Sequence, residues 1–173
     1  MRKIILFIAS SLDGYIARNS GEIDWLFTDQ DYGYSDFYSS IDTLLMGRKT
    51  YEQVLTFGEY PYQGVKTYVF SKNSRFSPTP ETEIISENIK IFVSNLKQQN
   101  GKNIWLVGGG QLVFELMNEK LIDEVILSIH PIILGEGISL FPAKMTPQFF
   151  QLSQCQSYNT GLVQLSYHLR DGN

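Results

Sequence analysis

Three consecutive glycines carry the strongest chemical signal in the sequence. Gly108, Gly109 and Gly110 follow an apolar segment and precede a segment of helical spacing that begins with Gln111 and Leu112. Glycine permits a tight turn and lets a ligand approach the main chain without a Cβ in the way. A helix that begins here would offer unpaired N–H groups and the positive end of its dipole, which favour phosphate. We therefore predict a phosphate-binding turn, with a flexible loop as the alternative.

A second turn combines glycine with positive charge. Gly47 ends another apolar segment and is followed by Arg48, Lys49 and Thr50. Arginine holds phosphate with a fixed fork, and lysine acts as a point charge. Cations at a helix N-terminus oppose the dipole by about 0.3–1 kcal/mol, and a bound anion would remove that conflict.

A third segment ends in Ser71 and Lys72, so three such turns carry groups suited to phosphate. Ligands of open α/β sheets bind beyond the carboxyl ends of the strands. A dinucleotide, which has several phosphates, fits three turns better than a mononucleotide does. We therefore predict one extended anionic ligand that lies across the sheet.

Alternating strands and helices would position these turns. Continuous apolar runs of the kind found in strands buried on both faces occupy residues 4–9, 43–46, 67–70, 104–107, 125–129 and 132–134. Helical spacing is found in residues 48–55, 88–99 and 111–120. This alternation predicts a parallel α/β sheet with right-handed crossovers.

The C-terminal part follows a different pattern. Residues 163–170 alternate apolar and polar side chains, which is typical of a half-exposed strand. Asn159, Thr160 and Gly161 predict a hairpin turn with residues 151–158 as the partner strand. Residues 74–82, which are rich in Pro, Ser and Thr, predict an exposed loop. The expected architecture is one domain over residues 1–173, a mostly parallel sheet that ends in an antiparallel hairpin.

Composition excludes several classes of protein. The 173 residues carry a net charge of −4 with 43% hydrophobic residues, which argues against disorder and against nucleic acid as a partner. No apolar run approaches the ~20 residues of a membrane helix. A lone thiol, Cys155, suits the cytoplasm and is interpreted as a small buried residue. His130 is expected to be structural and His168 exposed, and no cluster has the spacing of a metal site.

The motifs together resemble the dihydrofolate reductase-like superfamily. The turns at residues 47–51 and 108–112 carry this resemblance, and residues 9–17 (ASSLDGYIA) narrow it to the reductase domain of riboflavin biosynthesis, in its small stand-alone bacterial branch. Residues 134–138 (LGEGI) resemble that domain's late glycine turn. The resemblance covers roughly residues 2–170.

The resemblance implies a three-layer α/β/α fold, NADPH as the cofactor, and a homodimer. It places Ala9 and Ile16 beside the nicotinamide, Arg48, Ser71 and Lys72 near the adenosine phosphates, and a cis bond between Gly108 and Gly109. The residues assigned to the cofactor are Ala9, Ile16, Gly47, Arg48, Lys49, Thr50, Ser71, Lys72, Val107, Gly108, Gly109, Gly110, Gln111 and Leu112.

Substrate contacts are harder to assign. The family's reductases usually carry a Glu before the paired glycines, where this chain has Val107. By position, Asp31 is the candidate catalytic carboxylate, with Asp36 next, although Asp31 also fits a helix cap or a surface acid. Trp25 is a candidate pocket floor or core residue, and Asp13 a substrate contact or a turn-shaping side chain.

Five tyrosines add an open question to the substrate side. They predict either an aromatic wall of the pocket or a dimer face, and they are Tyr32, Tyr34, Tyr38, Tyr60 and Tyr62.

The predicted function is that of an NADPH-dependent reductase of a small heterocyclic substrate. Three alternatives remain open at this point: a catalytically lapsed nucleotide-binding or regulatory module, favoured by Val107; a pterin reductase of the dihydrofolate reductase type; and a protein that binds a flavin or a non-redox nucleotide.

Overall fold

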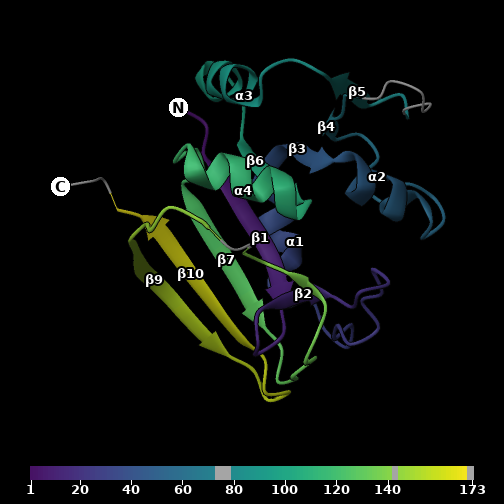
Figure 1. Ribbon diagram of the computed structural model, residues 1–173, viewed down its shortest axis with the longest axis vertical. Helices are drawn as coiled ribbons and strands as arrows, with labels where there is room; N and C mark the ends of the chain where they lie inside the picture. The colour runs from purple at the N-terminus through teal and green to yellow at the C-terminus, as the bar shows by residue number, and fades with distance from the viewer. Residues whose placement is uncertain (73–78, 142–143, 171–173) are drawn as a thin grey trace.

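The computed structural model describes residues 1–72, 79–141 and 144–170, which form an eight-stranded sheet with helices on both faces (Figure 1). The strand order is β5-β4-β3-β6-β1-β7-β10-β9. The strands of this sheet are β1 (Ile4–Ser10), β3 (Ile41–Gly47), β4 (Lys66–Phe70), β5 (Thr82–Ile85), β6 (Asn103–Gly108), β7 (Glu124–Ile129), β9 (Phe150–Ser157) and β10 (Val163–Leu169).

The first six strands of that order run parallel, and only the last two break the pattern. On β1, Leu6 pairs with Leu106 on one side and with Val125 on the other, both in parallel register. β10 pairs antiparallel with β7 and with β9. The predicted mostly parallel sheet with a C-terminal antiparallel hairpin is therefore confirmed.

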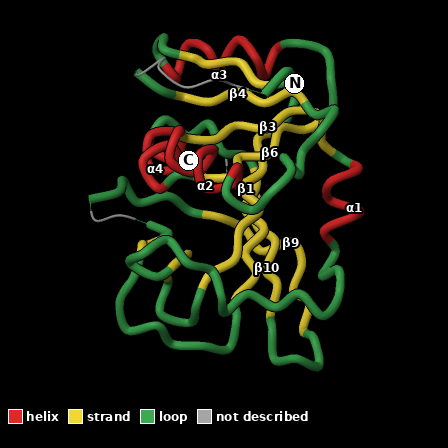
Figure 2. Tube along the Cα trace, turned by 90° about the vertical axis from the view of Figure 1, so that its right-hand side faces the viewer, coloured by secondary structure: helices red, strands yellow, loops and turns green. Residues whose placement is uncertain are grey.

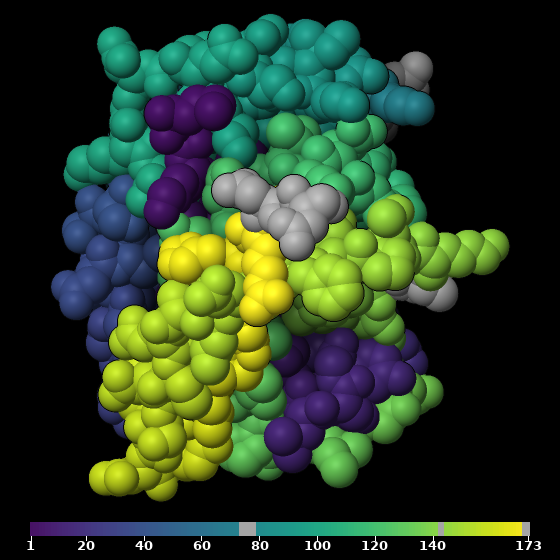
Figure 3. All heavy atoms as spheres, turned by 90° about the vertical axis from the view of Figure 1, so that its left-hand side faces the viewer, coloured from purple at the N-terminus to yellow at the C-terminus, as the bar shows by residue number. Residues whose placement is uncertain are grey.

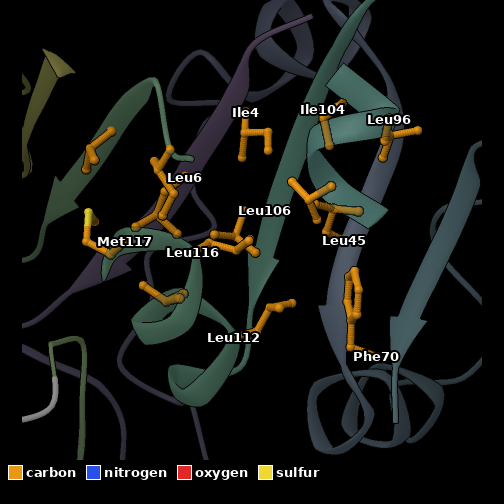
Figure 4. Packing of buried hydrophobic residues seen from close by; sticks show 14 of the residues in the cluster. Ile4, Leu6, Leu45, Phe70, Leu96, Ile104, Leu106, Leu112, Leu116 and Met117 are labelled. Carbon is orange, nitrogen blue, oxygen red and sulfur yellow. The ribbon is translucent and has the colours of Figure 1, made fainter. Parts of the chain in front are cut away.

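Alternation along the strands divides the core between the two faces of the sheet. Leu6 and Leu106 face one layer, whereas their neighbours Ile5 and Trp105 face the other. The first face is covered by α3 (Ile89–Gln98) and α4 (Gly110–Asn118), as Figure 4 shows for α4 with Leu112, Leu116 and Met117. The second face packs against α1 (Tyr34–Ser39) and α2 (Arg48–Leu55). Figure 2 shows α1 and α4 on opposite sides of the central strands.

Helix boundaries follow the signals in the sequence. α2 spans the predicted residues 48–55, and α4 starts directly after the glycine turn. At the start of α3, the Asn88 side chain accepts a hydrogen bond from the Ile91 N–H at 3.1 Å, which caps the helix. None of the described helices is both long and apolar enough to cross a membrane.

Residues 132–134, predicted as a strand, form a loop instead. Pro131 cannot donate to a ladder, and the chain leaves the sheet after β7. The N–H groups of Leu134 and Gly135 bond to the carboxylate of Asp13 at 3.1 and 2.7 Å rather than to a neighbouring strand. Of the predicted loop 74–82, residues 74–78 lie outside the described residues, and Thr82 begins β5.

Cys155 is exposed, so its interpretation as a buried residue was wrong. It lies on β9, the last strand of the sheet, whose side chains are almost all exposed. Figure 3 shows the β9–β10 hairpin at the molecular surface, in yellow and yellow-green. None of the described helices covers this edge strand, so the side chain of Cys155 has no hydrophobic core to pack into.

A small second sheet lies beside the end of β1. β2 (Tyr15–Ala17) pairs antiparallel with β8 (Ile138–Ser139). The approach is close because Gly137 has φ +155°, and a Cβ there would overlap the carbonyl oxygen of Ala17. The late glycine turn therefore holds Ile138 near Ile16, and both line the cleft described next.

Candidate active site

A cleft of about 950 Å³ opens where the parallel strands end. It collects the carboxyl ends of β1, β3 and β6 with the residues that follow β4 and β5. Every residue assigned to the cofactor from the sequence lines this one cleft: Ala9, Ile16, Gly47, Arg48, Lys49, Thr50, Ser71, Lys72, Val107, Gly108, Gly109, Gly110, Gln111 and Leu112.

Two of the predicted turns touch one another. A Cβ built on Gly109 would lie 3.3 Å from the Thr50 Oγ1 and 3.4 Å from the Gly47 Cα. Gly108 and Gly109 have φ values of +140° and +93°, which disfavour other residues. The expected cis bond is absent, since the described residues contain no cis peptide; the positive φ angles at the two glycines make the sharp turn instead.

The charged side of the cleft has the chemistry that a phosphorylated dinucleotide requires. Arg48, Lys49 and Lys72 line it next to bare glycine main chain and the first turns of α2 and α4. The Arg48 Nη1 lies 2.9 Å from the Glu52 Oε1, and both side chains are partly exposed. Because cations, unpaired helix N–H groups and an open glycine cradle meet here, the residues present fit NADPH.

The other side of the cleft is aromatic. Trp105, which is 6% exposed, has four rings around it with centroids at 5.3–6.2 Å, and these belong to Phe7, Tyr34, Phe37 and Tyr62. Its indole N–H donates to the Phe7 carbonyl at 3.1 Å. Phe7, Tyr62 and Trp105 line the cleft. Of the two readings of the tyrosines, the aromatic wall applies to Tyr62.

Burial keeps the phenols of this wall neutral. Desolvation, with the nearby Tyr34, Tyr60 and Tyr38, raises the pKa of Tyr62 far above its ordinary value. Desolvation likewise raises the pKa of Tyr34 to about 12, with smaller contributions from Tyr38 and Asp31. Near neutral pH both groups are therefore hydrogen-bond donors rather than phenolates.

The structure places the three residues proposed for substrate or catalysis outside the lining of the cleft. Asp31 is exposed, and its Oδ1 accepts hydrogen bonds from the Ser35 N–H at 3.1 Å and the Ser35 Oγ at 2.6 Å, in the first turn of α1. Asp13 bonds to Ser11 and to the loop after β7, so it shapes a turn. Trp25 is 7% exposed and packs edge-on against His130.

His130 supports one wall of the cleft from behind. It is 3% exposed, and its Nε2 accepts a hydrogen bond from the Phe27 N–H at 3.2 Å. Burial lowers the pKa of His130, which keeps the ring neutral and able to accept. The same segment places Ile23 and Leu26 in the cleft lining, which agrees with the structural role expected for this histidine.

Sequence reasoning missed Phe7 and Trp105. Both lie on predicted strands. Phe7 follows Leu6 and Trp105 precedes Leu106, so each points to the face of the sheet opposite to that leucine. Period-two alternation could have placed Trp105 and Val107 together on the second face. No local signal could have brought Tyr62 to them, because it lies in the segment between α2 and β4.

Comparison with known proteins identifies the family of the chain. A family model described as the RibD C-terminal domain matches residues 2–164. The chain belongs to the RibD C-terminal domain family. Among curated relatives, YwjB of Bacillus subtilis (strain 168) is 41% identical over 96% of this chain and 97% of its own. YyaP of the same organism is 37% identical over 96% and 95% of the two chains. Both relatives are described as uncharacterized proteins.

Solved structures place this RibD C-terminal domain among reductase folds. A candidate riboflavin biosynthesis protein from Shewanella sp. PV-4 superposes with a TM-score of 0.85 at 28% identity, over 99% of this chain and 100% of that one. A dihydrofolate reductase from Enterococcus faecalis, complexed with NADP(H), gives a TM-score of 0.74 at 16% identity, over 98% and 97% of the chains. The latter likeness concerns the fold alone.

Metal ligation has no support in the residues 1–72, 79–141 and 144–170. No group of three or more His, Cys, Asp and Glu side chains in these ranges is arranged to hold an ion.

Proposed function

We propose that the protein is an NADPH-dependent reductase of a small heterocyclic substrate, related to 5-amino-6-(5-phosphoribosylamino)uracil reductase of riboflavin biosynthesis. The observation that carries the proposal is the convergence of three separate turns on one cleft at the carboxyl edge of the sheet. Family membership supports a reductase, and the cleft supports the cofactor.

The residues divide the work of binding as their chemistry dictates. Main-chain N–H groups at the starts of α2 and α4 suit phosphates, and Arg48 suits the additional phosphate that separates NADPH from NADH. Ile16 and Ile138 provide an apolar wall near the end of β1, against which the uncharged nicotinamide ring could lie. Bound NADPH would supply a hydride; the protein supplies orientation and a dry surface.

Calorimetric titration with NADPH and NADH tests the proposal. Arg48→Ala should weaken NADPH by about ten- to hundredfold, because a charge-assisted hydrogen bond contributes about 1.5–3 kcal/mol, and should weaken NADH much less. Undetectable NADPH binding by the wild-type protein at millimolar cofactor contradicts the proposal.

Glu52→Ala is the matched control for Arg48→Ala. It removes the same ion pair on α2 but leaves the guanidinium in place. If loss of the ion pair alone explained the effect, the two variants would bind NADPH equally weakly. We expect Glu52→Ala to bind NADPH at least as well as the wild type.

A nucleotide-binding module without chemistry is the second candidate, and Val107 favours it. This apolar side chain lines the cleft where the family's reductases carry a glutamate. Binding of NADPH without its oxidation in the presence of pterins, pyrimidines and quinones would favour the module over the enzyme. Oxidation with any of them would favour the enzyme.

A further inference from the structure

The aromatic part of the cleft has an electrostatic character of its own. The ionisable groups that raise the pKa of Tyr62, after desolvation, are the phenols of Tyr34, Tyr60 and Tyr38. The carboxylate of Asp31 is the charged group that contributes to the raised pKa of the neighbouring Tyr34. This region therefore presents neutral phenols with a carboxylate nearby, whereas the cations Arg48, Lys49 and Lys72 of the cleft lining belong to the turns of the charged side.

Tyr62 itself is held in place by other rings. Its ring meets Trp105 edge-to-face at 5.4 Å and 82°, and Tyr60 at 5.5 Å and 87°. Edge-to-face contacts of this kind are a favoured arrangement of aromatic rings and restrain the ring of Tyr62. These contacts hold the phenol of Tyr62 in the lining of the cleft.

The Tyr62 hydroxyl also differs from its polar neighbours in having no hydrogen-bond partner among the residues that the structure describes. The Tyr60 hydroxyl pairs with Thr67 at 2.7 Å, and the Trp105 indole N–H donates to Phe7. The side-chain amide of Gln53, another lining residue, donates to the Gly21 carbonyl at 2.6 Å. The hydroxyl is not one of the fully buried unpaired polar atoms of the described residues, so an acceptor atom on a ligand in the cleft could reach it and accept its hydrogen bond.

We propose that this aromatic subsite binds an uncharged planar ring with a carbonyl oxygen or ring nitrogen, to which the Tyr62 hydroxyl donates a hydrogen bond. The subsite takes the hydride acceptor of the reductase proposed above, and in that respect it rests on the proposed function. The rings of Phe7, Tyr62 and Trp105 supply the apolar surface for a flat ligand. A phosphate or carboxylate on the ligand would be disfavoured beside these neutral phenols and would be repelled by the carboxylate of Asp31.

Binding of two matched probes tests the proposal without relying on turnover. Quinoxalin-2-one is neutral and planar and has both a carbonyl and a ring nitrogen, and its 3-carboxylate adds only a negative charge. By calorimetry without nucleotide, we expect the neutral probe to bind and the carboxylate to bind at least about tenfold more weakly. Tyr62→Phe should weaken the neutral probe about five- to tenfold, the loss of one hydrogen bond.

Tyr38→Phe is the matched control. Tyr38 is a neighbouring phenol of the same group but does not line the cleft, so its variant should bind the probe as the wild type does. Thermal melting checks that both variants fold, and NADPH affinity should be unchanged in Tyr38→Phe. Absence of binding by the neutral probe, equal binding of the two probes, or wild-type affinity in Tyr62→Phe would each overturn the subsite.

The two proposals fail separately. If the probe binds in a Tyr62-dependent manner but NADPH does not bind, the reductase proposal fails and the subsite remains. If NADPH binds with the expected dependence on Arg48 while the probe results fail, only the subsite is lost.

Discussion

The two sides of the cleft are constructed by different means. The charged side consists of short consecutive motifs at strand ends, in which glycine main chain does much of the shaping. The aromatic side consists of single side chains from β1, β6 and the segment before β4, which meet only after the chain has folded. One side depends on local backbone conformation and the other on packing.

Because of this difference, substitutions on the two sides should have different effects on ligand affinity and on stability. A change on the charged side should affect an anionic ligand with a limited loss of stability. A change on the aromatic side should affect the core first, because Trp105 belongs to the second hydrophobic cluster. The predictions below compare the two sides by measuring stability and ligand affinity in the same variants.

Trp105→Ala should have the largest effect. The side chain is 6% exposed and contacts several rings, and truncation of a buried Trp costs about 3–5 kcal/mol of unfolding free energy. Denaturant unfolding measures this loss, and Trp105→Phe should recover part of it. A loss below about 1 kcal/mol would mean that the aromatic side is not part of the core.

Gly109→Ala should lower the stability less than Trp105→Ala does, and it should lower the affinity for NADPH more. At φ +93°, with Thr50 and Gly47 close by, a Cβ adds strain of about 1–3 kcal/mol. NADPH affinity should fall by at least about tenfold, because the turn that shapes the cradle must shift. Calorimetry and denaturant unfolding measure the two effects.

Gly110→Ala provides the comparison for Gly109→Ala. Gly110 has no positive φ, and a Cβ there would meet only the Ser139 carbonyl oxygen at 3.8 Å, an ordinary contact. Its stability should equal or exceed that of the wild type, since alanine favours a helix over glycine. Equal stability losses in the two variants would remove the conformational argument for Gly109.

The residues of the charged side could be grouped from the sequence because its signals are local. The glycine turns, the cations and the strands that carry them are contiguous, and every residue assigned to the cofactor lines the cleft. The parallel strands and the hairpin were likewise readable from periodicity. One exception was residues 132–134, where Pro131 and the Asp13 carboxylate override an apolar run.

The aromatic side was not predictable to the same degree because its contacts join distant segments. Tyr62 and Trp105 are separated by two strands and a helix, and no spacing links them. The prediction by positional analogy was Asp31, whose carboxylate accepts hydrogen bonds from Ser35 at the start of α1. The resemblance therefore groups residues on turns shaped by the backbone more readily than single side chains from distant segments.

Asp31→Ala should have the smallest effect, and it tests whether that carboxylate belongs to either side of the cleft. Because it lies outside the lining, the affinities for NADPH and for quinoxalin-2-one should be unchanged. Stability should fall slightly at pH 7, as the hydrogen bonds to Ser35 are lost. A decrease in either affinity would return Asp31 to the site.

The pH dependence of the Asp31→Ala effect identifies its cause. Hydrogen bonds from Ser35 lower the pKa of Asp31 from its ordinary 3.8, so its stabilisation is complete above that value and is lost as the pH falls through the folded-state pKa. The difference in melting temperature between wild type and Asp31→Ala should therefore narrow below pH 3.8. A difference independent of pH would assign the effect to the side chain's contacts rather than to its charge.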